Sequence, residues 1–335
     1  MILTRTPLRV SLFGGGSDHP EHFLRHGGSV LGMAIDRYVY IGVKRMPPGQ
    51  IGADGTAIRY RVQYSHVDDC VHMSDVRHPA VRAALQYFSA MGYDEPMEFH
   101  CFADLPGRSG LGGSSSFVVA LLLALQAYNR LLGDDALCLA REALAFERGA
   151  VKEAGGFQDQ IFAAVGGIQY IEFGAESTVT PVLLTSVRSR ELEQSLVLVY
   201  SGAMRDGHAM AAKQLARLDT NRSLLRELSV MAGEARALLE DPGAPLDLVG
   251  RMLHATWQLK RELHPEISST EIDRLYHHGL SLGALGGKLC GAGGGGFLLF
   301  WVPPGRRAAF EEHIGAPCVG FRIARQGTHV LVDEP

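Results

Sequence analysis

The sequence lacks the features that mark membrane proteins, disulfide-stabilised proteins and zinc proteins. Its longest unbroken apolar run, residues 117–125, is far shorter than the roughly 20 residues that a membrane-spanning helix needs. The five cysteines are odd in number and never spaced C-x-x-C, which disfavours a disulfide framework and a zinc site. The first residues show no charged segment followed by an apolar one, so a signal peptide is not expected. These absences predict a cytoplasmic protein with no membrane partner.

The chain also has no excess of basic residues. Lys and Arg total 32, Asp and Glu total 36, and the net charge at pH 7 is −4, without a long run of either sign. This balance does not favour nucleic acid as a partner. With 335 residues, 46% of them hydrophobic, the chain is long enough for two domains with a core each.

Glycine, by contrast, is abundant, with 40 residues. It clusters at 14–16, 110–113, 155–156 and 291–296. Glycine is used where the backbone needs a positive φ or where a ligand must approach it closely, although tight turns are the alternative for any single cluster. Several such loops in one chain suggest that the protein binds phosphate groups.

Strands and helices are predicted to mix without regular alternation. Alternating or β-branched segments predict strands at 7–13, 37–43, 58–64, 97–103, 167–173, 195–200, 297–302 and 319–324. Apolar periodicity predicts helices at 79–91, 115–132, 135–152, 206–218, 221–240, 246–262, 270–283 and 305–314. This order favours an α+β fold over a doubly wound sheet, with a domain boundary near residues 185–195.

The segment 105–116, LPGRSGLGGSSS, lies between a predicted strand and the apolar helix at 115–132. The free N–H groups and positive dipole of the helix then face a loop with little side-chain bulk, which is typical of an anion site. Serine hydroxyls can donate to phosphate or ligate Mg²⁺. Simple N-capping explains one serine but not three. The segment therefore predicts a phosphate-binding loop.

A second glycine loop, 288–297, contains G-x-G-x-x-G at Gly291, Gly293 and Gly296. A dinucleotide fingerprint needs a strand, the loop and then a helix, whereas here a helix and a loop precede a strand. A Walker A loop is excluded because leucine follows Lys288.

Two carboxylates lie on either side of a Gly-Gly break, Glu147 near a helix end and Asp159 in GFQDQ. One could hold Mg²⁺ while the other orients or accepts the proton of a substrate hydroxyl. Surface salt bridges to Arg148 and Lys152 are the alternative.

Three segments, in order, resemble the galactokinase, homoserine kinase, mevalonate kinase and phosphomevalonate kinase superfamily. They are PLRVSLFGGGSD at 7–18, P-x-x-x-GLGGSSS at 106–116 and KLCGAGGGG at 288–296. The resemblance implies an ATP-dependent kinase with an α+β, two-domain fold. Residues 1–190 would form an ATP-binding domain like the second domain of ribosomal protein S5, and residues 191–335 a ferredoxin-like domain.

The resemblance also implies roles for individual residues. Asp159 matches the catalytic aspartate, and Arg9 stands where several relatives have a lysine near the transferred phosphate. Ser114 and Glu147 match the ligands of Mg²⁺. The ATP phosphates would be bound by Pro106, Gly110, Leu111, Gly112, Gly113, Ser114, Ser115 and Ser116. Gly113 replaces a serine, so this chain departs from the pattern there and at Arg9.

On the acceptor side, Ser17 and Asp18 match residues that contact sugar hydroxyls, and Gly291, Gly293 and Gly294 lie in a loop that closes on the substrate. Within the superfamily, segments 156–173 and 283–297 most resemble kinases of heptose 7-phosphate. That branch phosphorylates the anomeric hydroxyl, giving a 1,7-bisphosphate for nucleotide-activated heptose synthesis. The expected partners are ATP and a sugar phosphate, with a homodimer possible. Candidate contacts for the acceptor's own phosphate are Arg25, Arg108, Lys260, Arg261 and Lys288.

Other interpretations stay open at this point. They are a kinase of an unphosphorylated sugar resembling fucose or galactose, a lyase that decarboxylates after phosphorylation, and a non-catalytic sugar sensor. A nicotinamide oxidoreductase would need a strand before the loop at 291–296.

Overall fold

Two β-sheets organise the chain, shown here in a computed structural model that describes residues 1–334 except 53–54, 134, 154 and 204–206. The first sheet has the order β12-β1-β2-β5-β3-β4, and β6 joins it through β2 and pairs with β7. Its strands are β1 (Ile2–Phe13), β2 (Gly28–Arg45), β3 (Tyr60–Gln63), β4 (Val67–Cys70), β5 (Met97–Ala103), β6 (Ile168–Phe173), β7 (Thr178–Pro181) and β12 (His329–Asp333). The second sheet has the order β11-β8-β10-β9, with β8 (Leu196–Tyr200), β9 (Gly286–Leu289), β10 (Phe297–Trp301) and β11 (Cys318–Val319).

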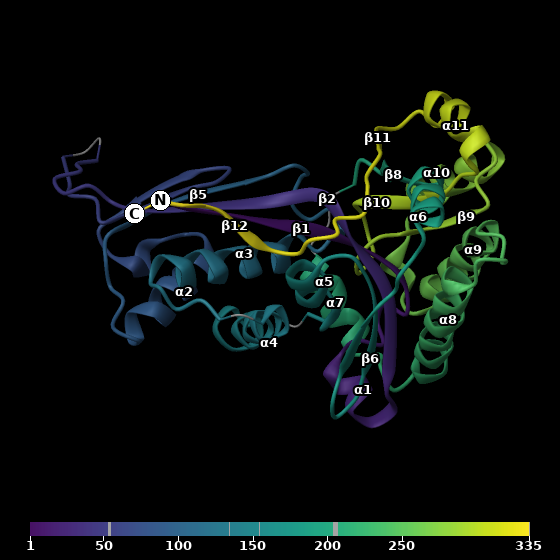
Figure 1. Cartoon of the computed structure of the whole chain (residues 1–335), viewed down its shortest axis with the longest axis horizontal. Coiled ribbons are helices and arrows are strands. Elements are labelled where there is room, and N and C mark those ends of the chain that lie inside the picture. Colours follow the sequence, from purple (N-terminus) through teal and green to yellow (C-terminus); the bar gives the residue numbers. More distant parts are fainter. Residues whose placement is uncertain (53–54, 134, 154, 204–206, 335) are drawn as a thin grey trace.

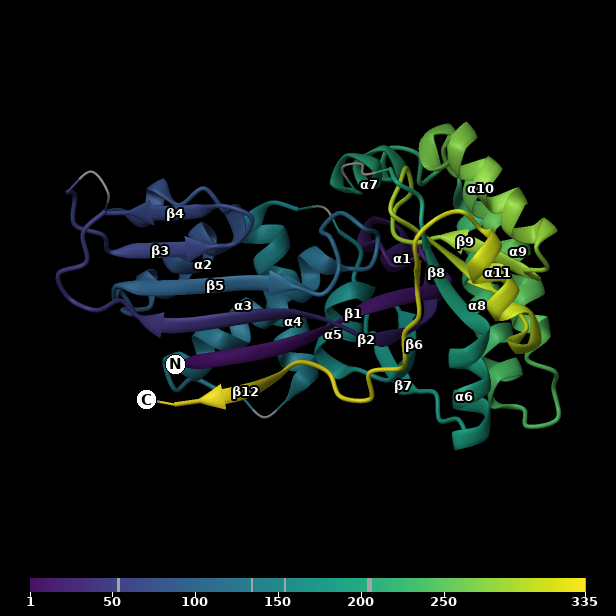
Figure 2. The ribbon, with the colours of Figure 1, turned by 90° about the horizontal axis from the view of Figure 1, so that it is seen from above.

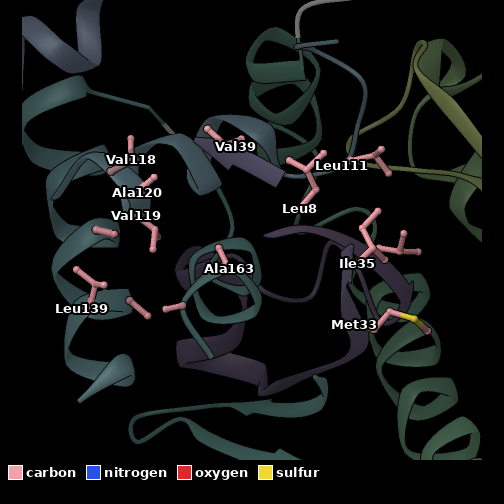
Figure 3. Packing of buried hydrophobic residues seen from close by; sticks show 14 of the residues in the cluster. Leu8, Met33, Ile35, Val39, Leu111, Val118, Val119, Ala120, Leu139 and Ala163 are labelled. Atoms are coloured by element: carbon pink, nitrogen blue, oxygen red, sulfur yellow. The ribbon is translucent and has the colours of Figure 1, made fainter. Parts of the chain in front are cut away.

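Helices cover one face of the first sheet (Figure 1). They are α2 (Pro79–Ala90), α3 (Gly113–Tyr128), α4 (Ala136–Phe146) and α5 (Gln158–Val165). Most side chains of α3 are buried, and the helix contacts β1 and β2 on one side and α4 and α5 on the other. Figure 3 shows Val118, Val119 and Ala120 of α3 beside Leu139 of α4 and Ala163 of α5. Because α3 is apolar almost all round, it belongs in the core, and this burial holds the glycine loop at its first turn in place.

Further helices lie in the half of the molecule that contains the second sheet (Figure 2). They are α6 (Ser186–Ser195), α7 (Gly207–Leu215), α8 (Arg222–Glu240), α9 (Asp247–Glu262), α10 (Thr270–Ser281) and α11 (Arg307–His313). A short helix, α1 (Pro20–His26), follows β1. Helix α8 packs on both α9 and β2, so it joins the two halves of the molecule. No helix among the described residues is long and apolar enough to cross a bilayer.

The α+β fold class is confirmed, and most predicted elements are present at nearly the predicted positions. Helix α3 ends at Tyr128, before the predicted end at 132, because Arg130 has a φ of 58°, which a right-handed helix cannot continue. The helix predicted over 135–152 ends at Phe146 and continues as a π-helical turn, Glu147–Val151. The strand predicted at 319–324 is reduced to β11. The predicted helix start at 206 lies outside the described residues.

The second glycine loop differs from its prediction, because the strand β9 precedes it. Two of the four residues of β9 are glycines, which are rare in strands, so local propensity gives no signal for it. β9 pairs with β10 in antiparallel fashion, and the loop is therefore the connection of a hairpin. The dinucleotide interpretation still fails, because a strand rather than a helix follows the loop.

The chain ends in the sheet in which it begins. Strand β12 pairs with β1 in antiparallel fashion, and the two termini lie side by side in Figure 1. The predicted division after residue 190 assigns this last strand to the second domain, whereas its hydrogen bonds are to the first sheet. The sequence offered no sign of this return, because strand pairing over such a distance depends on tertiary packing.

Candidate active site

A cleft of about 530 Å³ lies where the two halves of the molecule meet. Its walls come from the end of β1, the loop before α3, the start of α5, helices α7 to α9 and the β9–β10 hairpin. Polar lining residues include Arg9, Ser11, Asp18, His19, Ser114, Ser115, Glu147, Glu153, Gln158, Asp159, Lys260 and Lys288. Segments far apart in the sequence thus contribute to one site.

The glycine-rich loop forms one wall of the cleft and leads into α3. Gly112 occupies the N-cap position with a φ of 74°, and no side chain caps the helix. The capping interpretation of the serines is therefore wrong, and the first N–H groups of α3 are left for a ligand. Nearby, the rings of His78 and Phe117 stack with centroids 4.5 Å apart, and both residues also line the cleft. This end of the cleft combines the uncapped start of a helix with an aromatic surface.

Arg9 and Asp159 meet at the centre of the cleft. Nε and Nη2 of Arg9 donate to the two carboxylate oxygens of Asp159, both at 2.6 Å, and Nη1 donates to the carbonyl of Gly110 at 2.6 Å. The Arg9 side chain is 6% exposed and that of Asp159 is 21% exposed. Burial alone would lower the pKa of Arg9, but the charge of Asp159 raises it above its ordinary value. The bidentate pair fixes the direction of the Asp159 carboxylate.

Glu147 lies on the π-helical turn and is 3% exposed. Its Oε2 accepts hydrogen bonds from Gln160 at 2.6 Å and from Ser115 at 3.3 Å, whereas its Oε1 is buried without a partner. Burial raises the pKa of Glu147 to about 8 despite these hydrogen bonds. The predicted partner Ser114 instead donates to Glu153 at 3.2 Å. The alternative of surface salt bridges is wrong, because Arg148 pairs with Glu21 and Glu147 is buried.

These residues fit a divalent cation held mainly by a ligand's phosphates. A buried carboxylate oxygen without a hydrogen-bond partner, two serine hydroxyls and Glu153 surround one part of the cleft. Among the described residues no three His, Cys, Asp or Glu side chains converge as a complete metal site. Mg²⁺ commonly takes only one or two protein ligands and completes its shell with phosphates and water, so the donor set is suitable for it.

Asp18 is held at the start of α5. One carboxylate oxygen accepts from the backbone N–H of Gly16 at 2.9 Å, and the other accepts from the side-chain amide of Gln158 at 2.9 Å. A Cβ on Gly156 would lie 2.0 Å from Asp18 Oδ2, so only glycine fits there. Gly156 therefore makes room for Asp18 rather than for a phosphate.

Several predicted site residues do not line the cleft, although they lie in the right loops. These are Ser17, Pro106, Leu111, Ser116, Gly293 and Gly294. Leu111 is fully buried in the core, the Ser116 hydroxyl donates to the carbonyl of Pro7, and the Ser17 hydroxyl donates to the carbonyl of Gly14. The Ser116 and Ser17 hydroxyls thus support the backbone of β1 and of the loop that follows it.

Other residues that line the cleft were not predicted. No sequence motif singled out five polar side chains of the lining, namely Ser11, His19, Glu153, Gln158 and Gln214. His19 directly follows Asp18, and Gln158 directly precedes Asp159, so adjacency to a predicted residue was the available signal. Ser11 alternates with Arg9 along β1, which places both on one face of the strand. No comparable signal marks Glu153 or Gln214.

Two parts of the sequence match one protein family. Residues 78–167 match the GHMP kinases N terminal domain, and residues 235–319 match the GHMP kinases C terminal domain. Together they cover just over half of the chain, and they contain the glycine-rich loop, Glu147, Asp159, Lys260 and Lys288.

Similar proteins of known name include several kinases. The D-glycero-alpha-D-manno-heptose 7-phosphate kinase of Campylobacter jejuni is 28% identical over 313 residues, which is 91% of each chain. A bifunctional fucokinase/GDP-fucose pyrophosphorylase of Arabidopsis thaliana is 29% identical over 92% of this chain, but only 31% of that protein is covered. Among solved structures, a D-glycero-D-manno-heptose 1-phosphate kinase from Bacteroides thetaiotaomicron matches over 100% of both chains, with a TM-score of 0.79 and 22% identity. The Lactococcus lactis galactokinase has a TM-score of 0.73 and 17% identity, covering 98% of this chain and 94% of that one.

Proposed function

This chain belongs to the GHMP kinases, which are ATP-dependent phosphotransferases, and we propose that its acceptor is a heptose 7-phosphate, phosphorylated at the anomeric hydroxyl. It is a sugar kinase, and ATP is its cosubstrate. The observation that carries the acceptor proposal is the likeness to the Campylobacter heptose 7-phosphate kinase, which extends over 91% of each chain. The product would be a 1,7-bisphosphate.

The cleft supports a division of roles. The glycine-rich loop at the uncapped start of α3 would bind the ATP phosphates, with the base toward the His78–Phe117 end. Asp18, with Ser11, His19 and Gln158, would bind the acceptor's hydroxyl groups. Buried atoms without hydrogen-bond partners, namely Ser11 Oγ, His19 Nδ1 and Gln158 Oε1, support this assignment, because such atoms are costly unless a ligand satisfies them.

Asp159 would receive the proton of the anomeric hydroxyl as the new C1–O–P linkage forms and the bond between the γ-phosphorus and the bridging oxygen of ATP breaks. Arg9 holds Asp159 in one orientation and stabilises its negative charge. Phosphoryl transfer needs little covalent help from the protein, so positioning and charge stabilisation account for most of the catalysis. Ser114 and Glu147 would hold Mg²⁺, which when bound would neutralise charge on the phosphates.

The test is an acceptor panel with Mg·ATP. It contains D-glycero-D-manno-heptose 7-phosphate, the 1-phosphate of the same heptose, free heptose, galactose, fucose and mevalonate. We expect the 7-phosphate to give the highest kcat/KM, with the new phosphate coupled to H1 in phosphorus NMR. Asp159→Asn should lower kcat by roughly 10²–10⁴ with little change in ATP affinity.

Each outcome has a distinct meaning. Preference for a free hexose, or a product phosphorylated away from C1, would overturn the acceptor proposal. Normal turnover by Asp159→Asn would overturn the role given to that carboxylate while leaving the acceptor proposal intact.

A further inference from the structure

Two buried lysines line the cleft, and neither has a carboxylate partner among the residues that the structure describes. Lys260 lies on α9 and is 7% exposed, and Lys288 lies on β9 and is 3% exposed. Nζ of Lys260 donates to the carbonyls of Leu289 at 2.8 Å and Gly291 at 2.5 Å. Nζ of Lys288 donates to the carbonyls of Ser11 at 2.8 Å and Leu12 at 2.9 Å. All four acceptors are neutral.

Each ammonium group therefore has one donor that no described residue accepts from. A lysine ammonium has three N–H donors, and each of these two lysines uses two for carbonyls. Among the described residues neither lysine has an Asp or Glu oxygen within 4.0 Å. Burying a charge without an opposite charge is costly, and the cost is relieved when an anion binds beside it. Two such groups in one cleft indicate that a ligand supplies the missing negative charge.

The pKa values of both lysines are lowered, as expected for ammonium groups that are buried. Burial lowers the pKa of Lys288 to about 8, and burial together with the nearby charge of Lys288 lowers the pKa of Lys260 well below its ordinary value. Asp18 acts on Lys288 in the opposite direction, but its oxygens already accept hydrogen bonds from Gly16 and Gln158. Arg9, the other cation nearby, is already paired with Asp159.

Lys288 lies beside the residues assigned to the acceptor, because its Nζ donates to the carbonyl of Ser11 and the charge of Asp18 acts on it. Lys260 is close enough to Lys288 for the two charges to interact. The two lysines would thus lie beside the acceptor's hydroxyl groups.

We propose that Lys260 and Lys288 form the binding site for the phosphate that the acceptor already carries, an inference that rests on the proposed function. The other cationic candidates are less suitable. Arg25 and Arg108 are exposed, and Arg261 pairs with Asp273 at 2.9 Å outside the cleft. The lysines would make the enzyme select phosphorylated sugars over free ones, because a free sugar leaves both charges without a partner.

The experiment compares two acceptors that differ only in the phosphate, heptose 7-phosphate and free heptose, in the wild type and in Lys260→Met. Charge-assisted hydrogen bonds of this kind predict a fall of about 10- to 100-fold in kcat/KM for the 7-phosphate. The value for free heptose should fall much less than that for the 7-phosphate, and the KM for ATP should change by less than about threefold. Lys260→Arg should keep part of the selectivity, and Lys288→Met should act in the same direction as Lys260→Met.

Arg261→Met is the matched control, because it removes one positive charge from the same helix but outside the cleft. It should leave the selectivity unchanged. An equal loss with both acceptors, or a raised KM for ATP in Lys260→Met, would overturn the inference while the acceptor proposal stands. A wild type that does not prefer the 7-phosphate would overturn the acceptor proposal itself, before any variant is compared.

A measurement on the wild type keeps the inference testable should Lys260→Met fail to fold. Inorganic phosphate should compete with heptose 7-phosphate and should leave the turnover of free heptose unaffected. Competition against ATP alone would show that the lysines serve the nucleotide, and the inference would be wrong.

Discussion

Gly110 and Gly291 form a contact between the two halves of the site that can be tested directly. Gly110, in the loop before α3, has a φ of 80°, and a Cβ there would lie 2.6 Å from the carbonyl oxygen of Cys290. Gly291, in the β9–β10 hairpin, has a φ of 66°, and its Cβ would lie 2.7 Å from Cα of Gly110. Both loops are backbone at the contact, so neither can yield by a side-chain rotation. We expect Gly291→Ala to force the loops apart.

The magnitude follows from two costs. A left-handed conformation costs alanine roughly 1–2 kcal/mol, and overpacking against backbone costs typically about 1–3 kcal/mol. A total of about 2–5 kcal/mol is less than the usual stability of about 5–15 kcal/mol, so the variant should fold. For 335 residues, this corresponds to a lowering of Tm by about 3–7 °C. The carbonyl of Gly110 accepts from Arg9, so the shift also reaches Asp159.

Activity should fall more steeply than stability. A displacement of about 1 Å in a catalytic arrangement can cost about 10²-fold in rate. The assay is ADP release with the best acceptor of the panel, together with thermal unfolding followed by circular dichroism. Gly305→Ala is the control, because its Cβ would meet nothing within 4 Å and its φ is not positive. If Gly291→Ala keeps kcat/KM and Tm close to those of Gly305→Ala, the reasoning is refuted.

Two further predictions concern the residues assigned to Mg²⁺. Burial raises the pKa of Glu147 from 4.5 to about 8, so the stability that its protonated form confers is present below pH 4.5 and is lost as the pH rises through 8. Without Mg²⁺, the free energy of unfolding measured in urea should therefore fall by a few kcal/mol more in the wild type than in Glu147→Gln as the pH rises from 5 to 9. A difference between the two proteins that does not change with pH would contradict this. Ser114→Ala should raise the Mg²⁺ concentration needed for half-maximal activity, because it removes one of the two side chains proposed to hold the metal. An unchanged Mg²⁺ dependence in Ser114→Ala would place the metal elsewhere.

Elements with strong local signals were predicted correctly. The apolar helix after the glycine-rich loop is one example, since nearly every side chain of α3 is suited to the core. Shorter elements were missed for want of such a signal, including α1, β7 and β9. The π-helical turn at Glu147 was also missed, although Glu147 itself was singled out. Local periodicity cannot reveal a one-turn change of helix type, because packing against neighbouring segments decides it.

The sequence by itself determined the family, because the motifs that identify it depend on near neighbours. A glycine loop before an apolar helix, and an aspartate between two glutamines after a Gly-Gly break, were readable because their meaning depends on a few adjacent residues. Only the tertiary structure decided which charges share the cleft. Arg9 and Asp159 are 150 positions apart, and Lys288 is 277 positions from the carbonyl of Ser11 to which it donates. Burial sets the cost of each charge, and burial depends on packing between distant segments, which no local pattern of residues encodes.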